Sequence, residues 1–304
     1  MDPELLIVGA GPGGVTAALR ARSLDLAVEL LDAGEGPGGQ LHVMHFHPHD
    51  VPGFEAGDGA ALAAVYARQL AAAGVPLRAR SVARALEPLA GGAVVRLEGS
   101  EARRAQAVLI ATGVRRRRLD VPGERELEGR GVSSSATRDR ERFAGRRVVV
   151  VGGGDAAYEN ALLLAAAGSA VTLLVRGQPR SRAEFRARVA AEPRIRVRER
   201  TALVAIEGDQ GVQSVRWRGP EGEVREAADG VVVKIGVVPN TEWCRGAVAL
   251  DADGYVRVDA GLATSAEWVW ACGDVTRPQP PSVAVAMGQA TQAVAAIRAR
   301  LRGA

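Results

Sequence analysis

The 304-residue sequence predicts an α/β protein that contains two copies of one strand–turn–helix–strand unit. Two observations support this prediction. An apolar run, a glycine-rich turn and a helical stretch follow one another near the N-terminus, and the same order recurs near the middle of the chain. The chain is also long enough for two domains, and its 47% hydrophobic and 24% charged residues are typical of globular proteins.

The first copy begins with the apolar run L-L-I-V at 5–8, which has the length of a buried strand. The turn G-A-G-P-G-G at 9–14 follows it, and a helical stretch over 15–22 comes next. A second strand over 27–31 then ends at Asp32. This order of strand, G-x-G-x-x-G turn, helix, strand and acidic residue is the dinucleotide-binding pattern of Rossmann folds.

Each part of this pattern has a physical role in dinucleotide binding. Gly9 permits the tight turn, Gly11 lets a pyrophosphate approach the backbone, and Gly14 lets the helix pack closely against the strand. Pro12 belongs to the same turn, and the first N–H groups of the helix are unpaired and available to phosphate oxygens. Asp32 is placed to accept hydrogen bonds from the hydroxyl groups of a ribose.

The second copy begins with R-V-V-V-V at 147–151 and continues with G-G-G-D-A-A at 152–157. A helical stretch over 156–167 and a strand over 171–175 follow. One glycine pattern alone also fits an ordinary tight turn, but two copies in full context favour nucleotide binding. The residues predicted to bind the second nucleotide are Gly152, Gly154, Asp155 and Ala157, the last in place of the third glycine.

The second strand of this copy does not end at an acidic residue. The chain continues as V-R-G at 175–177, and Arg180 and Arg182 follow Arg176 closely. The missing carboxylate removes the repulsion of a 2′-phosphate, and an arginine supplies a charge-assisted partner for it. The sequence therefore favours NADP(H) over NAD(H) at this site.

Four further motifs occur in the order found in the low-molecular-weight thioredoxin reductases, a class of pyridine nucleotide-disulfide oxidoreductases. They are G-G-Q-L at 38–41, V-L-I-A-T-G at 108–113, G-V-V-P-N-T at 236–241 and A-C-G-D-V at 271–275. The chain resembles this family over nearly its whole length. The resemblance implies that FAD contacts Gly39, Gln40, Leu41, Thr112, Gly113, Gly273 and Asp274.

The resemblance also implies two Rossmann-like domains of the three-layer ββα type, the second inserted in the first. The FAD-binding domain is expected over 1–114 and 242–304, and the NAD(P)H-binding domain over 115–241. The stretch 281–301 agrees with this division, because it has a helical pattern and no glycine motif of its own. Members of the family are usually homodimers, so a homodimer is expected here.

The redox motif C-A-T-C of the family is replaced in this chain by S-A-T-R, with Ser135 and Arg138 at the two cysteine positions. Dithiol transfer needs a thiolate and a second thiol, which serine and the permanently cationic arginine cannot supply. Cys244 and Cys272 lie in separate segments, and Cys272 is interpreted as a small buried residue rather than a reactive thiol. We therefore predict that the protein does not reduce thioredoxin by the family's mechanism, and we identify no catalytic side chain.

Two other clusters of polar residues have alternative interpretations. The four histidines are His42, His45, His47 and His49, and the last three would share one face of an extended strand. Pro48 interrupts the run and no second ligand group exists, so we predict no metal site; a proton-transfer role near the flavin is the alternative. The arginine run 115–118 is interpreted as a solvated linker, the alternative being a docking patch for an acidic electron carrier.

The expected chemistry is hydride transfer from NADPH to FAD, in which the protein aligns the two cofactors and excludes water. Three interpretations remain open for the electrons. The first is a carrier such as ferredoxin or flavodoxin. Such a carrier accepts the electrons in the thioredoxin-reductase-like ferredoxin–NADP reductases, which also lack C-x-x-C. A small molecule is the second possibility, and the third is a non-catalytic nucleotide-binding sensor or partner protein.

Composition and patterning argue against two classes of partner. Aromatic residues make up only 4% of the chain and the formal charge is +4, which argues against a nucleic-acid surface. No apolar run reaches the ~18 residues that a membrane span needs. The N-terminal sequence lacks the basic and apolar regions of a signal peptide, so a cytoplasmic location is expected.

Overall fold

The computed structural model describes residues 2–303 and separates them into two compact units. The first unit consists of the residues up to Arg115 and those from Val238 on, and the inserted unit consists of Arg116–Val237. Each unit has its own parallel sheet and its own apolar core, as expected of a domain. The predicted α/β fold class is confirmed.

The central sheet of the first unit is parallel throughout. Ile7 lies between Leu30 on one side and Leu109 on the other. The first strand is buried along its whole length, which explains its uninterrupted apolar sequence. The strand order is β18 (Val269–Ala271), β7 (Ala107–Ile110), β1 (Leu5–Val8), β2 (Val28–Leu31) and β3 (Leu77–Arg78).

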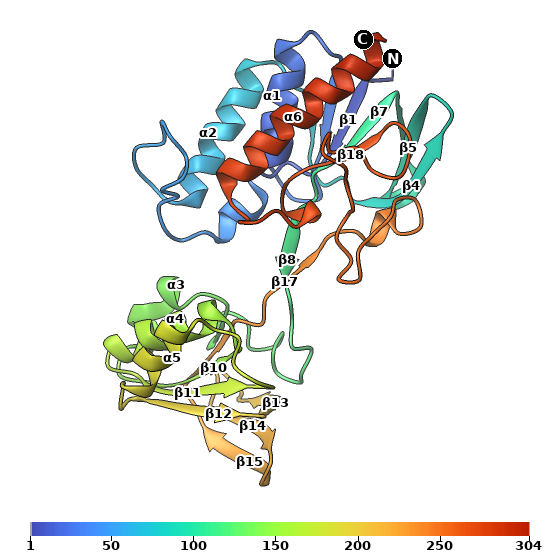
Figure 1. Ribbon diagram of the computed structural model, residues 1–304. Helices are drawn as coiled ribbons and strands as arrows, with labels where there is room; N and C mark the ends of the chain where they lie inside the picture. The colour runs from blue at the N-terminus through green and yellow to red at the C-terminus, as the bar shows by residue number, and fades with distance from the viewer. Residues whose placement is uncertain (1, 304) are drawn as a thin grey trace. The chain divides into compact units, whose positions relative to one another are not determined.

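Two different layers cover the faces of this sheet (Figure 1). Leu5 and Ile7 belong to the core shared with the helices, whereas Leu6 and Val8 belong to the core shared with a second, antiparallel sheet. The helices are α1 (Pro12–Ser23), α2 (Gly59–Ala72) and α6 (Val283–Arg302). The antiparallel strands are β4 (Ala83–Leu89), β5 (Gly92–Leu97) and β6 (Ala102–Ala105).

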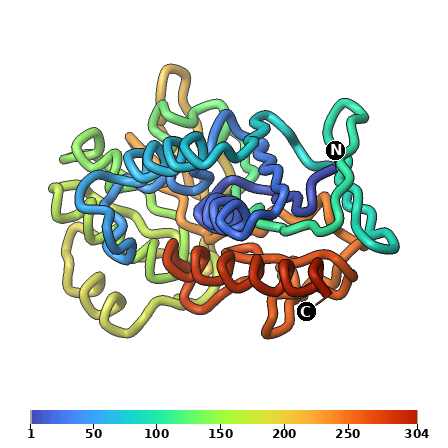
Figure 2. Tube along the Cα trace, turned by 90° about the horizontal axis from the view of Figure 1, so that it is seen from above, coloured from blue at the N-terminus to red at the C-terminus, as the bar shows by residue number. Residues whose placement is uncertain are grey.

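The last helix, α6, lies beside α1 although the two are at opposite ends of the chain (Figure 2). The hydroxyl of Ser282 caps α6 by accepting a hydrogen bond of 3.2 Å from the N–H of Val285. Gly303 ends the helix with a φ of 68°, a conformation that glycine adopts without strain. Within residues 2–303, no helix is both long and apolar enough to span a membrane.

The inserted unit repeats the same plan. Its parallel sheet has the order β12 (Ile195–Glu199), β11 (Ala170–Val175), β10 (Arg147–Val151), β16 (Gly230–Val233) and β9 (Val132–Ser133). Val150 packs in the core of the helices α3 (Ala136–Phe143), α4 (Asp155–Ala166) and α5 (Ala183–Ala190). Val149 packs in the core of the antiparallel strands β13 (Ala202–Glu207) and β14 (Ser214–Gly219). The strand β15 (Gly222–Ala227) completes this antiparallel sheet beside β14.

The chain passes between the units along β8 (Val114–Arg116) and β17 (Val237–Pro239), which pair with each other. The second passage lies at 237/238 and not at 241/242 as the sequence suggested. The reason is that Asn240 and Thr241 bond to the first unit. The Asn240 N–H donates to the Gly113 carbonyl at 3.0 Å, and the Thr241 hydroxyl donates to the Gly254 carbonyl at 2.7 Å.

Candidate functional site

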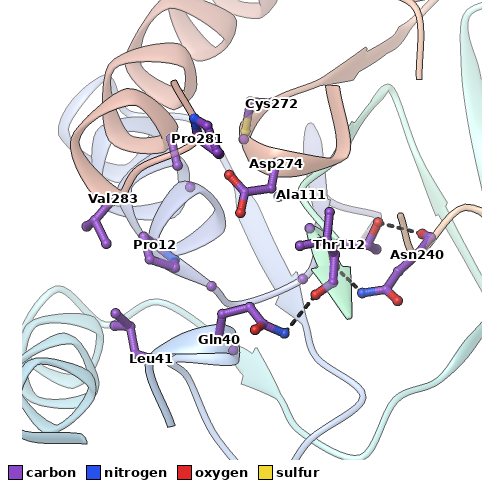
Figure 3. Close-up of a pocket in the computed structure, with 18 of the residues that line it drawn as sticks. Pro12, Gln40, Leu41, Ala111, Thr112, Asn240, Cys272, Asp274, Pro281 and Val283 are labelled. Carbon is purple, nitrogen blue, oxygen red and sulfur yellow. Dashed lines mark hydrogen bonds between the residues drawn. The ribbon is translucent and has the colours of Figure 1, made fainter. Parts of the chain in front are cut away.

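A cavity of about 360 Å³ opens at the carboxyl ends of β1, β7 and β18, next to the start of α1. This is the edge at which open parallel sheets bind their ligands. Its walls are the first glycine turn, the 3₁₀ turn Gly39–Val43, the segment 111–114 and the segment 272–274 (Figure 3). The cavity thus brings together residues from the first glycine turn and from all four further motifs.

The three glycines of the G-x-G-x-x-G pattern, Gly9, Gly11 and Gly14, occupy different environments. A Cβ on Gly9 would lie 2.4 Å from the Ala111 carbonyl oxygen, and one on Gly14 would lie 1.7 Å from the Gly9 carbonyl oxygen. Both positions therefore require glycine for packing, and Gly9 also has a φ of +108°. A Cβ on Gly11 would meet nothing within 4 Å, and no side chain caps the helix that starts there. Gly11 and the first N–H groups of α1 therefore face open space in which a phosphate fits.

The carboxylate of Asp32 is held in place by two backbone N–H groups. Its Oδ2 accepts from Ala10 at 2.6 Å, and its Oδ1 accepts from Gly34 at 2.7 Å. Each carboxylate oxygen has a second lone pair, so the group can still accept hydrogen bonds from a ribose. Asp32 lines the cavity at the end of β2, as the pattern predicts for this role.

Reciprocal hydrogen bonds fix one wall of the cavity (Figure 3). The Thr112 hydroxyl donates to the Asn240 carbonyl at 2.8 Å, and the Asn240 side-chain amide donates to the Thr112 carbonyl at 2.8 Å. The Gln40 side-chain amide donates to the Val114 carbonyl at 2.7 Å. Asn240 was missed as a site residue, although it belongs to the G-V-V-P-N-T motif at 236–241.

Another wall is formed by the segment that follows β18. Burial raises the pKa of Asp274, whose carboxylate lines the cavity. Cys272 also lines the cavity, and burial raises the pKa of its thiol to about 12. Gly273, with a φ of 76°, donates its N–H to the Gln289 side chain at 2.8 Å. Cys272 is therefore a small buried residue, as interpreted from the sequence, and not a thiolate.

A second cavity of about 430 Å³ adjoins the first. Both are lined by Gly9, Asp32, Thr112 and Asn240. The second cavity extends from there to the segment 81–84 and to Trp243. The two form one elongated site with Asp32 at the junction, which suits a ligand longer than a single nucleotide.

The glycine turn of the inserted unit has the same design. A Cβ on Gly152 would lie 2.1 Å from the Lys234 carbonyl oxygen, and Gly152 has a φ of +151°. A Cβ on Gly154 would meet nothing within 4 Å, and no side chain caps α4. Ala157 is buried against the helix core, where the third glycine of the pattern would lie. The turn can therefore receive a second phosphate group.

The three arginines after β11 are not equivalent. Arg182 donates from its backbone N–H and from its Nε to the two oxygens of Asp155, at 2.7 and 2.8 Å. Arg176 and Arg180 are exposed, and neither forms an ion pair among the described residues. Two of the three guanidinium groups predicted to bind a 2′-phosphate are thus available, and the third holds the start of α4.

The family model of the pyridine nucleotide-disulphide oxidoreductases matches residues 3–290. The chain belongs to this family. The thioredoxin reductase of Mycolicibacterium smegmatis is 37% identical over 282 residues, which cover 90% of this chain and 88% of that protein. The ferredoxin–NADP reductase of Thermus thermophilus is 33% identical over 312 aligned positions, which cover 94% and 89% of the two chains.

Solved structures of the family share the fold. The thioredoxin reductase of Lactococcus lactis has a TM-score of 0.82 and 27% identity, with 100% of each chain covered. The resemblance to thioredoxin reductases that the motifs suggested is confirmed. The chain spans only 56% of another relative, an alkyl hydroperoxide reductase component from Pseudomonas putida, to which it is 32% identical over 296 residues.

Ser135 and Arg138, which the sequence resemblance places at the redox cysteine positions, belong to a polar network. Ser135 is buried and precedes α3 as its N-cap. The Arg138 guanidinium pairs with Asp139 at 2.7 Å and donates to the Ser133 hydroxyl at 3.3 Å. Burial alone would raise the pKa of Asp139, but the hydrogen bonds from Arg138 and Ser133 hold it below its ordinary value.

The histidine segment differs from its sequence interpretation. No strand forms between 44 and 58, so His45, His47 and His49 do not share a strand face. The ring of His47 instead stacks on Phe54 with centroids 5.5 Å apart and bonds to the Gly57 carbonyl at 3.0 Å. Among residues 2–303, no group of three or more histidines, cysteines or acids is arranged to hold a metal ion.

The arginine run at 115–118 is not simply solvated. Arg115 donates to the Asn240 side chain at 2.9 Å and pairs with Glu242. Arg116 donates to the Ser134 carbonyl at 2.8 Å, and Arg118 pairs with Glu128 at 3.1 Å. These side chains fix the linker strand within each unit, which favours the linker interpretation over a free docking patch.

Proposed function

We propose that the protein binds FAD in the first unit and NADPH in the inserted unit, and that it is an NADPH-dependent oxidoreductase without a dithiol centre. The observation that carries this proposal is the repeated glycine turn. In each unit, one glycine leaves open space at the uncapped start of a helix, beside glycines that packing requires. Two such sites in one member of this family suit two dinucleotides.

The residues have separate roles in this proposal. Gly11 and the start of α1 hold the pyrophosphate of FAD, and Asp32 holds its ribose. Gly154 and the start of α4 do the same for NADPH, with Arg176 on the 2′-phosphate. The remaining residues proposed to hold FAD all line the cavity, and they are Pro12, Gly39, Gln40, Leu41, Thr112, Gly113, Gly273 and Asp274.

When bound, FAD supplies the chemistry of hydride acceptance and electron transfer, which no side chain of the site provides. The contribution of the protein is to orient the reactants and to exclude water. Buried Leu41 and Cys272 shield the cavity from solvent, and the Thr112–Asn240 hydrogen bonds keep one wall rigid.

We further propose that electrons leave without a thiol step. The chain has two cysteines, and both are buried and free. Burial raises the pKa of Cys244 and that of Cys272 to about 12, so neither thiol forms a thiolate near neutral pH. Iodoacetamide should therefore leave NADPH oxidation by the native protein unchanged, whereas a hidden dithiol centre would be inactivated.

We propose two candidates for the electron acceptor, a small molecule and a ferredoxin- or flavodoxin-type carrier. The similarity to the Thermus thermophilus ferredoxin–NADP reductase favours the carrier. Such an acidic carrier would accelerate NADPH oxidation strongly at low salt and weakly at high salt. Direct reduction of a quinone or dye would depend little on salt. We also propose a homodimer, which light scattering of the purified protein would test.

Anaerobic titration of the purified protein tests the main proposal. NADPH should bleach the visible absorption of bound FAD rapidly, and NADH should do so only at higher concentration. If neither nucleotide reduced fully bound FAD, the enzymatic proposal would be wrong, and a sensor or partner protein would replace it.

A further inference from the structure

Lys234 follows β16 at the carboxyl edge of the parallel sheet in the inserted unit. Its backbone N–H donates to the Val151 carbonyl at 2.8 Å, so the residue lies beside the second glycine turn. Because side chains alternate along a strand, Lys234 lies on the same side of the sheet as Val232, which packs in the core of the helices. Its side chain is therefore on the side of α4, whose start is proposed to hold the pyrophosphate of NADPH.

The ammonium group of Lys234 is available to a bound molecule. It forms no hydrogen bond or ion pair among residues 2–303, although Glu159 on α4 attracts it from beyond ion-pair distance. The residue is half-buried, but its Nζ is not sealed from solvent. An ammonium has three donors and no acceptor, so a ligand that approaches it must offer an acceptor.

The charges around Lys234 are mostly positive. Burial lowers the pKa of Lys234 to about 8, the charge of Arg116 lowers it further, and Glu159 opposes the two. Burial and the charge of Arg138 lower the pKa of Arg116 in turn. Asp139 is already paired with Arg138 at 2.7 Å. A ligand oxygen at the ammonium would therefore stabilise a charge that the protein itself leaves poorly compensated.

The order of the strands indicates which half of a dinucleotide reaches Lys234. The glycine turn follows β10, and β11 and β16 lie on opposite sides of this strand. Arg176, which is proposed to bind the 2′-phosphate of the adenosine half, follows β11. A dinucleotide lies across the crevice of such a sheet with its pyrophosphate at the central turn. The nicotinamide half of NADPH held in this way extends towards β16 and Lys234.

We infer that Lys234 is a cofactor-binding residue whose ammonium donates to a ribose or carboxamide oxygen in the nicotinamide half of NADPH. This inference rests on the proposed function, because it requires NADPH in the inserted unit. It places a second cation at the site, on the other side of the glycine turn from Arg176. Loss of the ammonium should weaken the complete cofactor and leave its adenosine half unaffected.

The first test compares the wild-type protein with Lys234→Met, which retains a long side chain without the charge. Isothermal titration calorimetry measures the binding of adenosine 2′,5′-bisphosphate and of tetrahydro-NADP, a complete cofactor that cannot donate hydride. Lys234→Met should bind tetrahydro-NADP roughly tenfold more weakly, the effect of one hydrogen bond from a charged group, and adenosine 2′,5′-bisphosphate unchanged. Arg176→Ala is the control from the other half of the site, and it should weaken the binding of both ligands.

Chemical labelling of the wild-type protein provides a second test that does not depend on a variant. Lys234 is the only lysine of the chain, so trinitrobenzenesulfonate modifies one ε-amino group, which mass spectrometry of its peptide separates from the terminal amine. Saturating tetrahydro-NADP should slow this labelling at pH 8, because a hydrogen-bonded ammonium keeps its proton. Saturating adenosine 2′,5′-bisphosphate should not slow it.

Three results would overturn the inference. They are unchanged affinity of a folded Lys234→Met for tetrahydro-NADP, an equal loss of affinity for both ligands, and labelling that tetrahydro-NADP does not slow. Wild-type protein that binds neither ligand would instead refute the proposed function.

Discussion

The hydroxyl of Ser135 accepts a hydrogen bond of 3.3 Å from the backbone N–H of Arg138. The resemblance to thioredoxin reductases places these two residues at the redox cysteine positions of that family. In this chain they form the N-cap of α3 and, through Arg138 and Asp139, an ion pair on its first turn. Both residues thus have a structural role, which is consistent with the proposed reductase without a dithiol centre.

Removal of the cap should destabilise α3. Ser135→Ala should lower the free energy of unfolding by about 1 kcal/mol, because the N–H of Arg138 then loses the hydroxyl that accepts its hydrogen bond. Ser135→Thr retains the hydroxyl and is the matched control. Urea unfolding measures both, and NADPH oxidation should be unchanged in both. A large loss of activity in Ser135→Ala with normal stability would show that the position still has a catalytic role.

The open position in each glycine turn leads to the second prediction. Gly11 has a φ of −72°, which alanine adopts, and its Cβ would meet nothing. Gly11→Ala should therefore leave the stability of the flavin-free protein unchanged and weaken FAD binding tenfold or more, roughly 1.4 kcal/mol, by blocking the pyrophosphate. Flavin fluorescence and thermal unfolding measure the two quantities.

Two further variants serve as controls for Gly11→Ala. Gly154→Ala is the matched change in the inserted unit, and it should weaken NADPH binding while leaving FAD binding intact. Gly14→Ala should destabilise the flavin-free protein, since its Cβ would lie 1.7 Å from a carbonyl oxygen. Normal FAD binding by Gly11→Ala would contradict the proposed pyrophosphate site.

The sequence predicted the elements that depend on local patterns, and it missed relationships between distant residues. Both glycine turns and their flanking strands form as expected, because apolar runs and glycines determine them locally. The pairing of Arg182 with Asp155 and the bonds of Asn240 to Thr112 depend on how separate segments approach each other. Alternating histidines suggested a strand at 45–49, but Pro48 and the absence of a neighbouring strand leave this segment as a loop.

Lys234, the only lysine of the chain, follows β16 at the edge where the inserted unit is proposed to bind NADPH. Burial, reinforced by the charge of Arg116 and opposed by Glu159, lowers its pKa from 10.5 to about 8. Between these values the unfolded chain binds more protons than the folded protein, so this group makes stability rise with pH. Lys234→Met should therefore stabilise the protein at pH 7 by about 1–2 kcal/mol, a gain that disappears above pH 10.5.

Two measurements check this prediction. Urea unfolding of the wild type and of Lys234→Met between pH 7 and 10.5 gives the difference in stability directly. The rate at which trinitrobenzenesulfonate labels the ε-amino group should also rise with a midpoint near pH 8, with Lys234→Met correcting for the terminal amine. A midpoint near the ordinary value of 10.5 would contradict the effect of burial.

The last prediction follows from the different contacts of the arginines after β11. Arg176 is exposed, whereas Arg182 is paired with Asp155 at the start of α4. Arg176→Ala should weaken NADPH binding by about 1.5–3 kcal/mol, roughly ten- to 150-fold. NADH binding should change little, because only NADPH has the 2′-phosphate. Arg182→Ala removes a partner of Asp155 near the site proposed for the pyrophosphate, which NADPH and NADH both have. It should therefore weaken the binding of both nucleotides to a similar extent. Anaerobic stopped-flow reduction at increasing nucleotide concentration measures the four affinities, and equal losses of NADPH and NADH in Arg176→Ala would refute the 2′-phosphate assignment.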